Sequence, residues 1–141
     1  MCAAVGLALT ACMADPVISE SGSEDRSAPH LALYPTRATH DALVGGRLLM
    51  VGRCLLLVAR DGTTYGLAWP SGRTEWDVIA EEIAMDEARA GIGEDVWIGG
   101  GPAAVTATNL NDPRWEWVQP PRVECLGEQV WIASSISTEQ P

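Results

Sequence analysis

Short apolar runs separated by glycine-containing dipeptides are the feature that most constrains the fold of this chain. Gly52-Arg53 separates the first run from the second, and Asp61-Gly62 separates the second from the third. Glycine accepts the positive φ of tight hairpin turns, so such dipeptides between β-rich runs indicate hairpins. Pro70 ends the third run because proline cannot donate to a ladder. The pattern predicts a three-strand meander, with strands at Leu43 to Val51, Cys54 to Ala59 and Thr63 to Trp69.

More strands are predicted after this meander. A strand at Glu94 to Ile98 is expected to end at Gly99-Gly100-Gly101-Pro102, and a weaker strand is expected at Ala104 to Leu110. Val130 to Ile136 is the predicted closing strand. A meander, an intervening segment and further strands follow each other in the order of a small OB-like barrel. The predicted fold class is therefore mainly β, as a small OB-like barrel or a meander.

The intervening segment, residues 74–90, allows two interpretations. One short helix around residues 75–90 is favoured by a capping pair, Thr74 with Asp77, and by Gly91 as a stop. Apolar residues also recur there at helical spacing, at Trp76, Ile79 and Ile83. A short hairpin is favoured by Asp86-Glu87 between two β-rich runs. The residues alone leave both open.

The first residues are apolar and end in Leu9-Thr10-Ala11-Cys12. This ending looks like a bacterial lipobox, where an export signal is cut before a cysteine that carries lipid. Residues 1–11 are then a signal peptide, whose apolar part is too short to span a bilayer. The basic residues that usually precede such a part are missing, and a start codon further upstream would supply them. Cys12 is the predicted lipidation site.

The cysteine count agrees with export. Cys2 leaves with the signal and Cys12 takes the lipid, so the mature chain keeps only Cys54 and Cys125. An even pair in an oxidising compartment indicates a disulfide. A zinc site is the competing interpretation, but residues 42–136 contain no histidine and no Cys-x-x-Cys spacing. We predict a disulfide between Cys54 and Cys125 and no metal.

Composition divides the mature chain into a tether, a domain and a tail. Residues 12–41 are rich in Ser, Glu, Asp, Pro and Ala, with one apolar island at Leu31 to Tyr34 that could dock on the domain. The β-rich domain is expected at residues 42–136 and the tail at 137–141. A net charge of -10 repels phosphate backbones and anionic lipid. Nucleic acid is therefore not an expected partner, and membrane attachment depends on the lipid on Cys12.

Turns, tryptophans and a cysteine pair recur through roughly residues 43 to 132. The series comprises Gly52-Arg53-Cys54-Leu55, Tyr65 to Trp69-Pro70, Gly93-Glu94-Asp95-Val96 with Gly99-Gly100-Gly101, Cys125, and Val130-Trp131. With the Leu9 to Cys12 motif, it resembles small, mostly uncharacterised lipoproteins of high-GC bacteria. The resemblance implies a lipid anchor, a β-rich fold and strands after Trp-Pro, but no reaction. The helix-prone stretch Val78 to Met85 departs from that pattern.

No complete catalytic motif is visible. The only histidines, His30 and His40, lie in the tether and are expected to be solvated. Gly99-Gly100-Gly101 has neither P-loop nor dinucleotide-binding spacing, and no cofactor is expected. Eight carboxylates are the best candidates for chemistry, and a solvated acidic face, calcium binding and glycoside hydrolysis are the three interpretations. They are Glu75, Asp77, Glu81, Glu82, Asp86, Glu87, Glu94 and Asp95.

Tryptophan is the other conspicuous residue type. The chain has six tryptophans and no phenylalanine, so tryptophan is expected to supply much of the bulky core. Trp115 and Trp117 flank Glu116 in an expected extended run, which would put both rings on one face. Exposed rings there would stack on a sugar or a partner, and the alternative is a satellite core patch under a loop.

Together these features predict a lipid-anchored domain on the extracytoplasmic face of the cell membrane. The leading functional hypothesis is a binding or envelope-interaction module, with an envelope glycan or a protein as its partner. The alternatives are a small carboxylate-dependent hydrolase that acts on cell-wall glycan, and a purely structural envelope protein.

Overall fold

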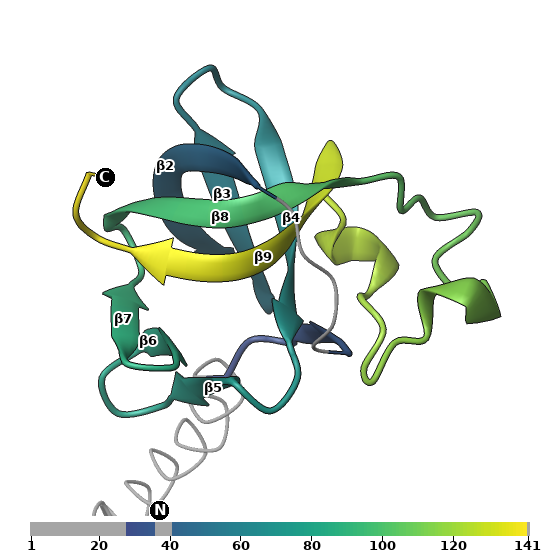
Figure 1. Cartoon of the computed structure of the whole chain (residues 1–141), viewed down its shortest axis with the longest axis horizontal. Coiled ribbons are helices and arrows are strands. Elements are labelled where there is room, and N and C mark those ends of the chain that lie inside the picture. Colours follow the sequence, from purple (N-terminus) through teal and green to yellow (C-terminus); the bar gives the residue numbers. More distant parts are fainter. Residues whose placement is uncertain (1–27, 36–40, 141) are drawn as a thin grey trace, which may run out of the picture.

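A computed structural model describes residues 28–35 and 41–140 of the chain (Figure 1). These residues form strands and two 3-10 turns, η2 and η3. The strands are β1 (Ala32–Tyr34), β2 (Ala42–Val51), β3 (Cys54–Ala59), β4 (Thr64–Pro70), β5 (Thr74–Asp77), β6 (Glu82–Met85), β7 (Ala88–Gly91), β8 (Asp95–Ala103) and β9 (Gln129–Ser137). The turns are η2 (Pro113–Trp115) and η3 (Val123–Cys125).

Five of these strands close into a barrel. β2, β3 and β4 form the predicted antiparallel meander, and β8 pairs with β2 on one side and with β9 on the other. β9 also pairs in parallel with β4, which closes the sheet. The resulting order, β4-β3-β2-β8-β9 and back to β4, is that of an OB-like barrel. The predicted mainly β fold class is confirmed.

Alternating side chains from the barrel strands fill its interior. β3 contributes Leu55 and Leu57, and β8 contributes Val96 and Ile98. Tryptophan is part of this core, since Trp69 is 1% exposed and Trp131 is 4% exposed. Burial of every second residue is expected for a strand that turns one face to a core. The main core of the domain is therefore the inside of the barrel.

The segment between β4 and β8 forms a small sheet, and the helical alternative is wrong. β6 pairs with β5 and with β7. The Asp77 carboxylate accepts the backbone N–H groups of Ile79 and Ala80, which turns the chain after β5. This side-chain bonding competes with helix formation. Ile83 and Met85 alternate inward from β6 and belong to the barrel core, so the small sheet packs against the barrel.

The apolar island in the predicted tether is strand β1, which pairs in parallel with the end of β4. Tyr34 is buried, and its hydroxyl donates to the Ala133 carbonyl at 2.6 Å. Leu33 exchanges backbone hydrogen bonds with Gln119 on its other side. Residues 28–35 are thus part of the folded domain, which takes in more chain than the predicted range of 42–136. β9 likewise includes Ser137 from the predicted tail.

The strand expected at Ala104 to Leu110 is absent, and so is the break expected at the glycines. β8 runs on to Ala103 through an irregularity between Gly99 and Gly100. Gly100 has φ 139°, and a Cβ there would collide with the Ile132 carbonyl. Residues 104–128 then form a long connection, which we call the long loop. In it the Asn109 side chain accepts from the Thr106 N–H and donates to the Ala104 carbonyl, replacing strand pairing.

The predicted disulfide between Cys54 and Cys125 is present. Cys54 is the first residue of β3, and Cys125 is the last residue of η3 in the long loop. Close to the bridge, Gly66 of β4 faces the backbone of Cys125 and Leu126 so closely that a Cβ would clash. The disulfide therefore fixes the long loop against the outer face of the barrel.

Replacing the disulfide should destabilise the domain. The bridge joins residues 71 apart, and loop-closure estimates for such a loop give about 4 kcal/mol. The Cys54→Ser, Cys125→Ser double variant should unfold at correspondingly lower denaturant concentration than the oxidised chain. Addition of reductant should lower the melting temperature of the parent and leave that of the double variant unchanged. Equal unfolding midpoints for the parent and the double variant would contradict this assignment.

Candidate functional site

The long loop brings Trp115 and Trp117 together as a stacked pair. Their ring centroids lie 5.8 Å apart and the ring planes meet at 28°. Trp115 is the last residue of η2, and Glu116 follows with φ 55°. The expected extended run is therefore wrong, because a turn rather than strand alternation places the two rings side by side.

Both indole N–H groups are used by the loop itself. Trp115 Nε1 donates to the Asn109 carbonyl at 3.0 Å, and Trp117 Nε1 donates to the Leu110 carbonyl at 2.9 Å. A buried or half-buried indole usually finds such a partner. The hydrogen bonds fix the orientation of both rings, so any ligand would meet their faces and edges rather than their polar atoms.

The tryptophan pair is half-buried against a second apolar cluster. This satellite core lies between the long loop, β1 and the outer faces of β4 and β9. Its buried members are Ala32, Tyr34, Ala68, Val105, Leu110, Leu126, Val130 and Ile132. The pair thus contributes to packing on one side while part of its surface stays accessible.

A depression of about 340 Å³ opens beside Trp115. It is lined by Ala104, Asn109, Asp112, Arg114 and Trp115. Arg114 Nη2 donates to Asp112 Oδ2 at 2.7 Å, and this pairing lowers the pKa of the Asp112 carboxyl below its ordinary value. The Arg114 side chain is 88% exposed. Neither residue was singled out from the sequence, although their opposite charges sit directly before Trp115.

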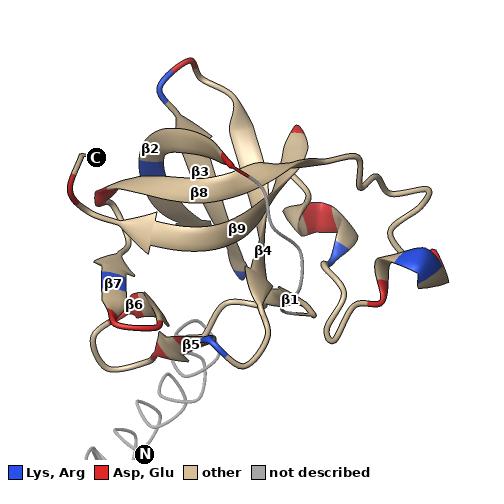
Figure 2. Cartoon of the chain, viewed as in Figure 1, with Lys and Arg blue, Asp and Glu red and all other residues tan. Residues whose placement is uncertain are grey.

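Two arginines pair with three of the eight carboxylates of the acidic cluster (Figure 2). Arg73 forms a bidentate pair with Asp86, and Arg89 bridges Asp77 and Glu82. The Arg73 hydrogen bonds lower the pKa of Asp86, and the Ala80 amide and Arg89 lower the pKa of Asp77. A general acid needs a raised pKa, so Asp77 and Asp86 do not have the properties of one.

Carboxylate oxygens of this kind are the ligands that calcium prefers. Within residues 28–35 and 41–140, no group of three or more His, Cys, Asp or Glu side chains is placed to hold a metal ion. At Asp77, Glu82 and Asp86 the arginines already bind oxygens that calcium would require. No described part of the acidic cluster therefore offers a calcium site.

His30 differs from the solvated residue that the sequence predicts. Its Nε2 lies 2.8 Å from the Pro120 carbonyl, and its backbone N–H donates to the Arg53 carbonyl. Nε2 therefore carries the proton, since a carbonyl only accepts. His30 joins the start of the described chain to the long loop. His40 and the predicted lipidation residue, Cys12, lie outside the described residues.

Comparisons with known proteins give no further assignment. No family model matches the chain, and no curated protein or solved structure matches it. Among the described residues, no helix is both long and apolar enough to cross a membrane.

Proposed function

We propose that this chain is a lipid-anchored binding module on the extracytoplasmic face of the membrane, with its ligand surface at Trp115 and Trp117. The observation that carries the proposal is the stacked pair beside the depression of about 340 Å³. Long loops without regular structure in small domains are commonly functional. This one is held in place on a closed barrel, so its surface is organised before a ligand arrives.

A sugar ring is the ligand that the residues around the depression suit best. The lining includes the Trp115 indole, an aromatic surface of the kind on which the C–H groups of a sugar stack. The Asp112–Arg114 pair at the rim supplies charged donors and acceptors for hydroxyl groups. A few polar groups around an apolar surface are typical of small-molecule sites. An envelope glycan is therefore the proposed ligand. A protein partner is the alternative, and the test must distinguish the two.

The anchor is proposed from the sequence. The Leu9 to Cys12 motif provides the lipidated cysteine, and residues 13–27 separate Cys12 from the first described residue. A chain of that length reaches about 50 Å at full extension. A domain on such a tether can contact glycan within that distance of the bilayer.

Alanine variants of Trp115 and Trp117 test the ligand surface. A stacking role contributes roughly 1 kcal/mol to binding, so each variant should weaken glycan binding about fivefold. Because both rings are half-buried, the stability loss should stay below the roughly 3 to 5 kcal/mol of a fully buried tryptophan. Arg114→Gln should weaken binding without a stability loss, because the side chain is exposed. Trp97→Ala is the matched control, since Trp97 is half-buried on another barrel face.

The measurement is a titration with soluble cell-wall glycan fragments, followed by tryptophan fluorescence, together with thermal unfolding of each variant. If both variants lose as much free energy of unfolding as a fully buried tryptophan would, and no fragment changes the fluorescence, the pair serves packing alone. Equal weakening by Trp97→Ala would also contradict a localised site.

A separate experiment tests the anchor. The chain expressed from its native gene region in a bacterial host should partition into detergent if Cys12 carries lipid. Cys12→Ser removes the thiol that receives the lipid and should move the chain to the soluble or unprocessed fraction. Mass spectrometry of the N-terminal peptide checks the modification directly. Equal partitioning of the two forms would refute the lipid anchor.

A further inference from the structure

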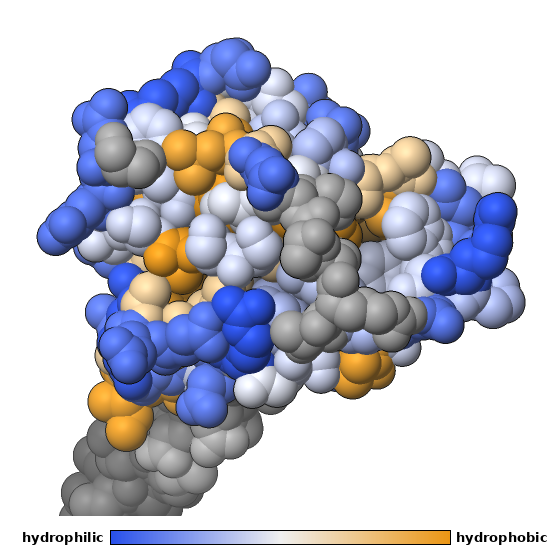
Figure 3. Space-filling view, in the orientation of Figure 1, coloured by the Kyte–Doolittle hydropathy of each residue, from blue (hydrophilic) through white to orange (hydrophobic). Residues whose placement is uncertain are grey.

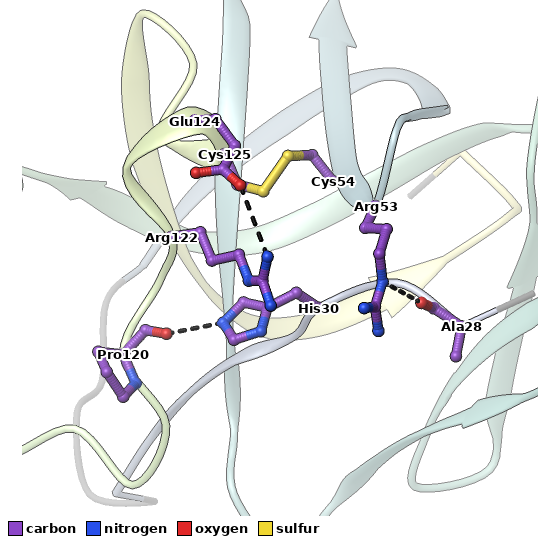
Figure 4. Close-up of a disulfide and its surroundings, with 8 residues drawn as sticks. All are labelled: Ala28, His30, Arg53, Cys54, Pro120, Arg122, Glu124 and Cys125. Carbon is purple, nitrogen blue, oxygen red and sulfur yellow. Dashed lines mark hydrogen bonds and ion pairs between the residues drawn. A yellow bond between two sulfur atoms is a disulfide. The ribbon is translucent and has the colours of Figure 1, made fainter. Parts of the chain in front are cut away.

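A second depression lies beside the disulfide, where the β2–β3 turn meets the long loop (Figure 4). Its volume is about 430 Å³. Its lining includes Arg53, which lies in the turn, and Arg122, which is the residue before η3. The two arginines lie far apart in the sequence. The disulfide between Cys54 and Cys125, which lie near them in the chain, brings them to one surface. This site is separate from the tryptophan pair and does not depend on the proposed glycan binding.

The charge of the depression differs from that of the rest of the domain. The chain has 19 acidic and 9 basic residues, and Arg73, Arg89 and Arg114 each pair with a carboxylate at 2.6 to 3.1 Å. Arg53 makes no ion pair with a carboxylate among the described residues. Arg122 Nη1 lies 3.7 Å from Glu124 Oε2, which is beyond hydrogen-bond distance. Two guanidinium groups with unused donors therefore line one surface of an acidic protein.

A backbone carbonyl orients the Arg53 guanidinium in the depression. Arg53 Nε donates to the Ala28 carbonyl, which leaves both of its terminal nitrogens available. The His30 ring is held by Pro120, and in Figure 4 both arginine side chains lie on the same side of the disulfide as that ring. Exposed Val51 and half-buried Leu56 add apolar surface to the same depression. Arg53 is thus oriented by a backbone carbonyl, and Arg122 has Glu124 as its nearest charged neighbour.

We propose that this depression binds a phosphate group, held between Arg53 and Arg122. Guanidinium groups bind oxyanions through pairs of parallel hydrogen bonds. Two guanidinium groups arriving from different chain segments suit the tetrahedral oxygens of phosphate better than the planar oxygens of one carboxylate. The apolar residues beside them would contact the group that carries the phosphate. Glu124 opposes the anion, and its side chain is 61% exposed and can turn into solvent.

Phosphate titration of the full chain carrying Cys12→Ser tests this site, with NMR signals of the arginine Nε–H groups and of the Gly52 amide as readout. Ionic strength is held constant with chloride. Arg53→Gln and Arg122→Gln should each weaken phosphate binding about tenfold, the loss expected for one charged hydrogen-bonding partner. Glu124→Gln should strengthen binding severalfold because it removes the opposing charge. Arg47→Gln, which changes an exposed arginine elsewhere, should leave the affinity unchanged.

An equal loss of affinity in Arg47→Gln, or no response of the Arg53 and Arg122 signals to phosphate, would overturn the proposal. A second experiment, with vesicles of phosphatidylglycerol, distinguishes a lipid headgroup from a soluble molecule as the source of the phosphate. Vesicle binding that is lost in Arg53→Gln and kept in Arg47→Gln would identify a lipid headgroup. Arginine-dependent binding of inorganic phosphate without vesicle binding would identify a soluble phosphorylated ligand. Either result supports the phosphate site.

Discussion

The parallel pairing of β4 with β9 closes the sheet, and the long loop depends on that closure for its position. β8 and β9 are antiparallel neighbours, which two residues are enough to connect. The connection instead runs through residues 104–128 and folds back over the outer faces of β4 and β9 (Figure 1). Its length is therefore not required by the topology, and both candidate sites lie along it.

Three contacts fix the long loop on the barrel. The disulfide attaches it to β3, the close approach at Gly66 seats it on β4, and the satellite core packs beneath its tryptophans. β1 adds a fourth contact from the N-terminal side through Gln119. Figure 3 shows only scattered apolar patches on the viewed face, one of them near the β5–β6 turn, where Ile79 is 95% exposed. In the long loop, Val105, Leu110 and Leu126 are buried in the satellite core, whereas Val118 and Val123 are exposed.

Local turn chemistry made much of the barrel predictable. The glycine dipeptides predicted the β2–β3–β4 hairpins. The two cysteines that remain after removal of the signal and lipidation of Cys12 predicted the disulfide. Residues 74–90 stayed ambiguous because helical spacing coincided with strand alternation, and the Asp77 turn decides between them. The strand expected at residues 104–110 failed because Asn109 bonds its own loop. Arg53 and Arg122 had no local signal, since only the folded disulfide brings them to one depression.

Amide hydrogen exchange tests most directly whether the long loop is a fixed surface. In the oxidised chain, the Gln119 and Glu128 amides donate to Leu33 and Thr64, and both should be protected. Reduction of the disulfide, at a temperature where the barrel stays folded, should speed their exchange while β2 and β3 amides keep their protection. Unprotected amides in the oxidised chain, or identical exchange before and after reduction, would contradict the claim that the disulfide and barrel hold this loop in place.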